Sequence, residues 1–172
     1  MEIKLENYIR DIKDFPKPGI VFKDITPLLS NHRVSKACLE QLLSLVGNQK
    51  IDKVVGVEAR GFFFGNSLAQ SLNAGFVPVR KPGKLPAVTI SQTYDLEYGT
   101  DTLQIHKDAI KPGDRVLIHD DILATGGTAK AVCNLVERLG GVIVQCNFLI
   151  ALDFLQGAQK INKYPITSVL HY

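Results

Sequence analysis

The chain is poor in the features that mark secreted, membrane-spanning and nucleic-acid-binding proteins. Its only cysteines, Cys38, Cys133 and Cys146, are widely spaced and form no Cys-x-x-Cys pair, so we expect reduced thiols in a cytoplasmic protein. No apolar run approaches the roughly 20 residues of a membrane helix, and Met1–Asp14 is charged throughout, unlike a signal peptide. The net charge of +3 is too small to indicate a nucleic-acid partner, although clustered basic residues would suit an anionic small molecule.

Two common phosphate-binding signatures are absent as well. The P-loop pattern Gly-x-x-x-x-Gly-Lys-[Ser/Thr] does not occur, because Thr128 and Ala129 follow the late glycine pair, and the dinucleotide pattern Gly-x-Gly-x-x-Gly is missing too. The composition, 45% hydrophobic and 22% charged, is that of an ordinary globular protein, and 172 residues suffice for a full core. We therefore expect a single domain spanning residues 1–172.

One late stretch nevertheless has the features of a phosphate site. The apolar run Val116–Ile118 predicts a short buried strand, Asp120 and Asp121 follow at its carboxyl end, and Thr125-Gly-Gly-Thr128 leads into a helix predicted over 129–139. Glycines let an anion approach the backbone, and the amides at a helix start attract it. Open α/β sheets bind ligands at this edge. The stretch therefore predicts a phosphate site beside a polyol or metal site, whereas an isolated Asp-Asp or Gly-Gly would merely shape a turn.

Strands and helices alternate from residue 53 onward, which predicts an α/β fold with a mainly parallel twisted sheet flanked by helices. An amphipathic helix is predicted over 1–15, ended by two prolines, and an extended piece over 20–27. A hairpin-like excursion over 85–102 is a candidate lid. The remaining expected strands cover 53–57, 76–79, 142–151 and 165–170, and the remaining expected helices follow Ser30 or Asn31 as far as Val46 and cover 63–72.

The basic segment Arg80-Lys-Pro-Gly-Lys84 follows an expected strand. Three cations within five residues would suit a pyrophosphate, but the segment alone favours a solvated basic turn.

The stretch from the acidic pair to Thr128 resembles the phosphoribosyl-pyrophosphate motif of type I phosphoribosyltransferases. Four further blocks, in the same order, are similar to adenine phosphoribosyltransferases, so that the resemblance covers nearly the whole chain. It implies the fold of that family, with a small N-terminal hood segment and a lid loop, and the magnesium-dependent conversion of adenine and phosphoribosyl pyrophosphate into AMP and pyrophosphate in purine salvage. The four blocks are Phe15–Thr26, Glu58–Phe62, Val79–Pro86 and Tyr94–Gly99.

The resemblance also implies a role for individual residues. Asp120 and Asp121 would hold the ribose hydroxyls and favour the positive charge that develops on the sugar, and Glu97 would act on the purine as acid, base or hydrogen-bond partner. Tyr98 would lie on the lid. The 5-phosphate would be held by Ala124, Thr125, Gly126, Gly127 and Thr128, the adenine by Val21, Phe22 and Lys23, and the pyrophosphate by Glu58, Ala59, Arg60, Arg80 and Lys84.

Magnesium would be held mainly by the substrate, with no direct protein ligand assigned. A homodimer is implied, with Arg80 reaching across its interface, and the peptide between Glu58 and Ala59 would be tight and cis. His119 departs from the family, which usually has an aliphatic residue there, and we expect it to be neutral, buried and partnered. Two alternatives stay open: a phosphoribosyltransferase for another nucleobase, and a non-catalytic regulator that senses phosphoribosyl pyrophosphate.

Overall fold

The computed structural model describes residues 3–96 and 99–172, and internal contacts divide the chain into two compact units, Met1–Gln41 and Leu42–Tyr172. In the first unit, β1 (Arg10–Lys13) pairs antiparallel with β2 (Val21–Asp24), and a short helix, α1 (Thr26–Leu29), follows. The extended piece expected over 20–27 is thereby confirmed for its central residues.

The amphipathic helix predicted over residues 1–15 is wrong. Within residues 3–15 only Leu5–Tyr8 is helical, as a 3₁₀ turn, and β1 begins two residues after it. Pairing with β2 satisfies the backbone of β1, and Arg10 at its start bonds the carboxylate of Asp24 at 2.6 Å. Long-range strand pairing therefore outweighs the helical spacing of apolar residues in this segment.

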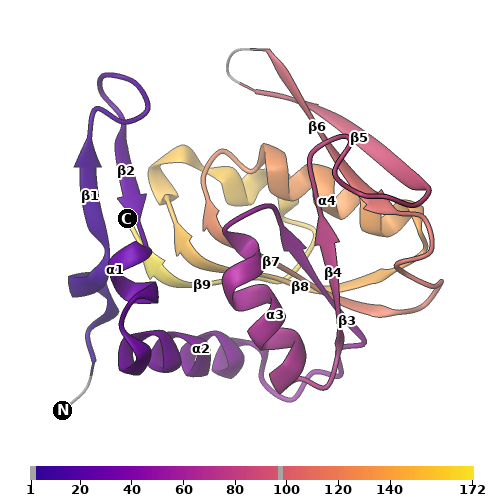
Figure 1. Cartoon of the computed structure of the whole chain (residues 1–172), viewed down its shortest axis with the longest axis horizontal. Helices are drawn as coiled ribbons and strands as arrows, with labels where there is room; N and C mark the ends of the chain where they lie inside the picture. The colour runs from indigo at the N-terminus through magenta and orange to yellow at the C-terminus, as the bar shows by residue number, and fades with distance from the viewer. Residues whose placement is uncertain (1–2, 97–98) are drawn as a thin grey trace. The chain divides into compact units, whose positions relative to one another are not determined.

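The second unit contains a five-stranded sheet in which every neighbouring pair is parallel, as predicted (Figure 1). Long crossover connections, rather than tight turns, join its successive strands, which is why the sheet can be parallel. In spatial order the strands are β4 (Gly75–Val79), β3 (Lys53–Val57), β7 (Arg115–Leu123), β8 (Val142–Ala151) and β9 (Ile166–His171).

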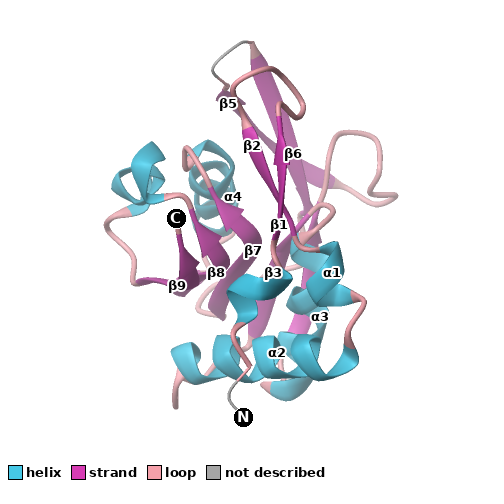
Figure 2. Cartoon of the chain, turned by 90° about the vertical axis from the view of Figure 1, so that its left-hand side faces the viewer, coloured by secondary structure: helices cyan, strands magenta, loops and turns pink. Residues whose placement is uncertain are grey.

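Three longer helices accompany these strands. Asn31 begins α2 (His32–Val46), because its Oδ1 accepts hydrogen bonds from the amides of Arg33 and Val34 at 3.1 and 3.2 Å. The helices α3 (Gly61–Ser71) and α4 (Gly127–Arg138) cover opposite faces of the sheet (Figures 1 and 2). In the described part of the chain, no helix has the length and apolar character that crossing a membrane requires.

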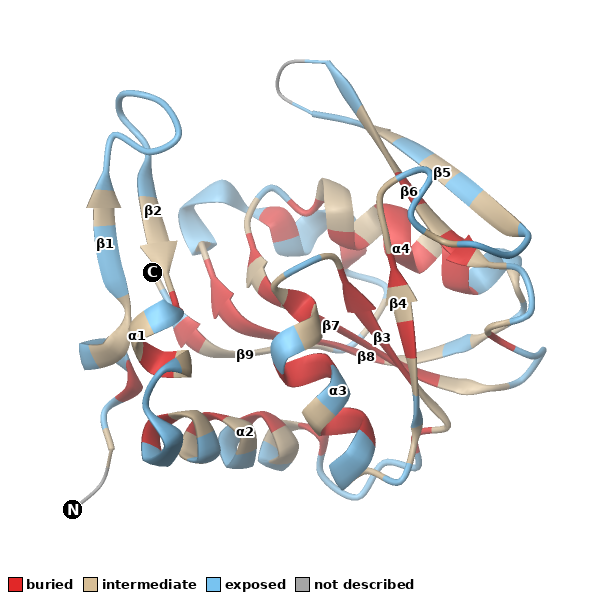
Figure 3. Cartoon of the chain, in the orientation of Figure 1, coloured by how far each residue is buried: buried red, intermediate tan, exposed pale blue. Residues whose placement is uncertain are grey.

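The core lies between the sheet and α4, where the central strands are almost fully buried (Figure 3). Two of the cysteines, Cys133 on α4 and Cys146 on β8, belong to this core as free thiols with their sulfurs 3.8 Å apart. Both are therefore packing residues. Cys38 is also buried and free.

The excursion before β7 is a hairpin, as predicted. Its strands β5 (Thr89–Asp95) and β6 (Thr100–His106) pair antiparallel and run beside α4 (Figure 1). Arg138 near the end of α4 donates a 2.6 Å hydrogen bond to the carbonyl of Ser91, which ties the hairpin to that helix.

Candidate active site

The strand order creates a crevice between β3 and β7. The chain moves outward from β3 to β4 and later returns to the other side of β3 with β7, so α3 and α4 leave these neighbouring strands on opposite faces. Ligands of open α/β sheets bind at the carboxyl ends of the strands beside such a reversal. Residues after β3 and at the end of β7 are therefore expected to share one site.

The acidic pair lies within β7 rather than after it, because β7 is longer than predicted. Asp120 still pairs with Phe148 on β8, whereas pairing with β3 stops at His119, so the pair extends past the end of β3. The amide of Asp121 donates a 2.9 Å hydrogen bond to Oδ1 of Asp120. Burial, and then the charge of Asp121, raise the pKa of Asp120 well above its ordinary value.

Arg60, which follows β3, reaches the acidic pair from the other side of the crevice. Its Nε lies 3.0 Å from Oδ2 of Asp121, which is only 3% exposed. Burial raises the pKa of Asp121, and the guanidinium of Arg60 opposes that effect. Gly61 begins α3 directly behind, where a Cβ would lie 3.0 Å from Oδ1 of Asp120. The close approach of α3 to β7 at this point thus needs a glycine.

The loop 124–128 forms a cradle next to the acidic pair. Gly126 has φ +78 and precedes the first turn of α4, which receives no side-chain cap from the described residues. The first amides of the helix are therefore available to an anion. Arg60 and residues 120–129 line a cavity of about 200 Å³ here. The structure thus brings together the predicted phosphate loop, the acidic pair and Arg60.

A residue not singled out in the sequence, Gly157, supports this loop from behind. A Cβ on Gly126 would collide with the carbonyl of Gly157, and a Cβ on Gly157 would collide with the carbonyl of Ala124. The two glycines thus let the loop 124–127 pack directly on backbone. No local pattern around Gly157 indicates this partner, because Gly126 and Gly157 are 31 residues apart in sequence.

The basic segment after β4 folds around Glu58. The Glu58 carboxylate accepts bonds from Arg80 Nη2 at 3.1 Å, Lys84 Nζ at 2.9 Å and the amide of Lys81 at 2.8 Å. Burial acts to raise the pKa of Glu58, but these hydrogen bonds outweigh it and lower the pKa to about 2. The Glu58–Ala59 peptide is cis, as predicted. Arg80 and Lys84 therefore both bind the Glu58 carboxylate.

Lys81 instead lines the crevice together with the acidic pair, although it was not among the predicted site residues. It lines a second part of the crevice, of about 240 Å³, together with Arg60, Tyr94 and Thr128. Its ammonium forms an ion pair with Asp101 of β6. The sequence shows three cations in this segment but not which of them faces the crevice, because that depends on how the segment folds.

The predicted adenine-binding residues belong to the first unit. Val21, Phe22 and Lys23 lie in β2, where the Phe22 ring packs edge-on against Phe15 at 5.2 Å and Lys23 Nζ bonds Asp11 at 2.7 Å. The predicted lid residues Glu97 and Tyr98 lie outside the described residues.

His119 precedes the acidic pair and is fully buried, as predicted. Its Nδ1 lies 3.0 Å from Oδ1 of Asn147 on β8. Burial lowers the pKa of His119 to about 4, while the bond to Asn147 opposes this, so the ring is neutral at pH 7. Asn147 in turn donates to the carbonyl of Leu42 at 3.4 Å. His119 thus packs in a polar seam under the end of α2.

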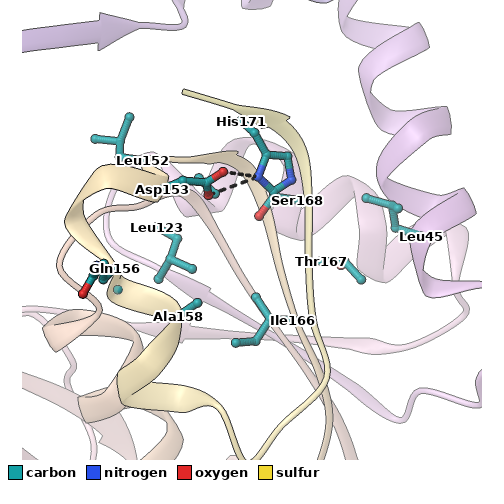
Figure 4. A pocket seen from close by; sticks show the side chains of 12 residues that line it. Leu45, Leu123, Leu152, Asp153, Gln156, Ala158, Ile166, Thr167, Ser168 and His171 are labelled. Carbon is teal, nitrogen blue, oxygen red and sulfur yellow. Dashed lines mark hydrogen bonds and ion pairs between the residues drawn. The ribbon is translucent and has the colours of Figure 1, made fainter.

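A further cavity of about 310 Å³ lies at the ends of β8 and β9 (Figure 4). Asp153 and His171 face each other at its rim, with the imidazole Nδ1 3.0 Å from the carboxylate, and Ile166 contributes an apolar wall. Leu123 lines both this cavity and the cavity of the phosphate loop, so the two are neighbours at the end of β7.

The fold and the site together define an α/β protein in which a Thr-Gly-Gly-Thr loop and an acidic pair line one cavity at the carboxyl end of a parallel sheet strand. A family model described as phosphoribosyl transferase domain matches residues 24–170. An adenine phosphoribosyltransferase of Flavobacterium johnsoniae is 66% identical over 170 residues, which cover 99% of this chain and 100% of that protein. The chain therefore belongs to the adenine phosphoribosyltransferase family of the type I phosphoribosyltransferases.

Solved structures agree. The crystal structure of an adenine phosphoribosyltransferase from Rhodothermus marinus is 55% identical, with a TM-score of 0.93 over 98% of this chain and 96% of that one. An enzyme of the same name from Saccharomyces cerevisiae, in complex with adenine and an imino-altritol bisphosphate, is 42% identical with a TM-score of 0.91, covering 96% of each chain.

Proposed function

We propose that this chain transfers the phosphoribosyl group of phosphoribosyl pyrophosphate to adenine, giving AMP and pyrophosphate in purine salvage. The observation that carries the proposal is the crevice between β3 and β7, where the Thr125–Thr128 loop, the acidic pair and Arg60 line one cavity. The close relative from Flavobacterium johnsoniae and the adenine in the yeast structure support adenine as the acceptor.

The phosphate loop and the acidic pair hold the ribose 5-phosphate end of the donor. The uncapped amides at the start of α4 and the Thr128 hydroxyl donate to the 5-phosphate, while Ala124 to Gly127 shape the loop. Asp120 and Asp121 bond the 2- and 3-hydroxyls of the ribose. Burial raises the pKa of both carboxyls, but Arg60 beside Asp121 opposes this, so Asp121 carries the negative charge of the pair and accepts. That negative charge also favours the positive charge that develops on the ribose as pyrophosphate leaves.

The departing pyrophosphate is neutralised by cations from both sides of the crevice. Arg60 lies beside the acidic pair, and Arg80 and Lys84 are gathered on Glu58, next to the Glu58–Ala59 peptide. Magnesium would be held mainly by substrate oxygens, with no protein ligand assigned, and would supply further positive charge. Among the described residues there is no group of three or more His, Cys, Asp or Glu that could hold a metal ion.

The base and the lid complete the site. Phe22 packs near the adenine, the backbone of Val21 and Lys23 recognises its edge, and Glu97 transfers a proton to or bonds its imidazole ring. The β5–β6 hairpin is the proposed lid, to which Tyr98 is assigned, and it excludes water from the electrophilic ribose. In this assignment residues 1–172 act as one phosphoribosyltransferase domain in a cytoplasmic homodimer, with Arg80 reaching toward the partner; the free thiols support a reducing compartment.

Offering adenine, hypoxanthine, guanine, xanthine and orotate separately, each with phosphoribosyl pyrophosphate and magnesium, tests this assignment through pyrophosphate release. We expect release with adenine alone. Release with a different base would identify another phosphoribosyltransferase, and binding of the donor without release for any base would identify a regulator.

A further inference from the structure

One side chain of the hairpin, Tyr94, contacts the phosphate loop. Its hydroxyl lies 3.2 Å from Oγ1 of Thr128, and its ring lies 3.4 Å from where a Cβ of Gly127 would be. The same hydroxyl lies 3.3 Å from Oδ2 of Asp101, the cross-strand partner of Tyr94 on β6. Tyr94 therefore stands between a residue of the phosphate loop and a carboxylate of the hairpin.

Asp101 extends this chain of contacts to the basic segment. Its Oδ2 also forms the ion pair with Lys81, while its Oδ1 accepts the amide of Thr102 at 2.8 Å. Lys81, Tyr94, Asp101 and Thr128 all line the part of the crevice that contains Arg60 and the acidic pair. The contacts thus run from the proposed 5-phosphate end of the site to a cation on its pyrophosphate side.

The hydroxyl protons available along these contacts make the hydrogen bond at Thr128 and the ion pair at Lys81 depend on each other. The Tyr94 hydroxyl has one proton and two neighbouring acceptors, and a carboxylate cannot donate. Without a phosphate every contact is satisfied if Thr128 donates to Tyr94 and Tyr94 donates to Asp101. A phosphate in the loop attracts the Thr128 proton, because a charge-assisted bond is roughly twice as strong as a neutral one.

Tyr94 must then turn its own proton toward Thr128, since two hydroxyl oxygens 3.2 Å apart need a proton between them. Asp101 loses one of its donors and holds the Lys81 ammonium more tightly, so that less of that charge is available to a second anion. We propose that Tyr94 and Asp101 are positioning residues that couple the two ends of the donor site, so that an occupied 5-phosphate site weakens pyrophosphate binding. This inference rests on the proposed function, in which such coupling would favour the release of pyrophosphate.

Titration calorimetry on the full chain tests the coupling with two probes, ribose 5-phosphate and magnesium pyrophosphate. We expect saturating ribose 5-phosphate to raise the Kd of pyrophosphate about tenfold, the value of roughly one hydrogen bond to a charged group. The coupling is the ratio of the pyrophosphate Kd with ribose 5-phosphate to the Kd without it. Tyr94→Phe, which removes only the hydroxyl, and Asp101→Asn, which removes the charge, should each bring this ratio to within about twofold of unity.

Tyr164→Phe is the matched control, because the Tyr164 hydroxyl also bonds a carboxylate, Glu137 at 2.7 Å, and lines neither part of the crevice. Its ratio should equal that of the wild type. An unchanged ratio in both Tyr94→Phe and Asp101→Asn, or a wild-type ratio of unity, would overturn the coupling alone. Failure of the wild type to bind either probe would overturn the proposed function and the coupling with it.

Discussion

Replacing His119 should change how the stability of the protein depends on pH. The imidazole is fully buried against Asn147, and burial lowers its pKa to about 4, against the usual value of 6.5. In the unfolded chain the ring protonates at the usual value. Between the two values the unfolded state binds more protons, so the free energy of unfolding is unaffected above about pH 6.5 and falls as the pH approaches 4.

The magnitude follows from the two pKa values. The gap between them corresponds to roughly 3 kcal/mol when both states are fully protonated. Between pH 7 and pH 5 the expected loss is about 2 kcal/mol from His119 alone, because at pH 5 the unfolded ring is largely charged and the folded ring is not. That is a large part of the stability of an ordinary domain.

Urea unfolding of the wild type and His119→Gln at pH 7 and pH 5 measures this difference. Glutamine keeps an amide that can bond Asn147 and does not titrate, so the variant should lose about 2 kcal/mol less than the wild type over this interval. His32→Gln is the control, because His32 is exposed at the start of α2. The decrease in the unfolding free energy of this variant between pH 7 and pH 5 should equal that of the wild type. Equal losses in His119→Gln and the wild type would refute the inference that a buried neutral imidazole opposes folding in acid.

Three further predictions concern the site. Gly126→Ala should weaken AMP and phosphoribosyl pyrophosphate binding alike, by about tenfold or more in calorimetry, because the added Cβ would collide with Gly157 and φ at this position is positive. Gly113→Ala is the control: Gly113 has a similar φ but open space around it, so this variant should bind both ligands normally. Glu97→Gln should lower turnover more than it weakens binding of the donor, and unchanged turnover would remove Glu97 from the mechanism. The proposed reach of Arg80 requires a dimer, so light scattering at micromolar concentration should give twice the chain mass; a monomeric mass would contradict it.

Local sequence predicted much of the second unit because its elements are set by continuous signals. The apolar runs that became β3 and β8 have the predicted bounds, Lys53–Val57 and Val142–Ala151, because strands buried in a parallel sheet are largely apolar. The loop before α4 was equally recognisable from Gly126 and its neighbours. By contrast, residues 10–13 became a strand through pairing with β2, which no local spacing could indicate.

Within the site, the sequence identified chemical groups but not their partners. Arg80, Lys81 and Lys84 are equivalent as cations in the sequence, and only the fold gathers two of them on Glu58 and turns Lys81 toward Asp101. The contact between Gly126 and Gly157 likewise depends on how distant segments pack. Such pairings follow from tertiary structure, which is why residue type alone left them open.

The most direct test of the central claim is to identify the product made from labelled adenine. With phosphoribosyl pyrophosphate and magnesium, the wild type should convert adenine to AMP and release one pyrophosphate per AMP. Asp120→Asn combined with Asp121→Asn should abolish most of this conversion while the variant remains folded, because the ribose hydroxyls lose both carboxylates. Absence of labelled AMP with the wild type, or full conversion by the double variant, would contradict the account of the crevice between β3 and β7 as the site of transfer.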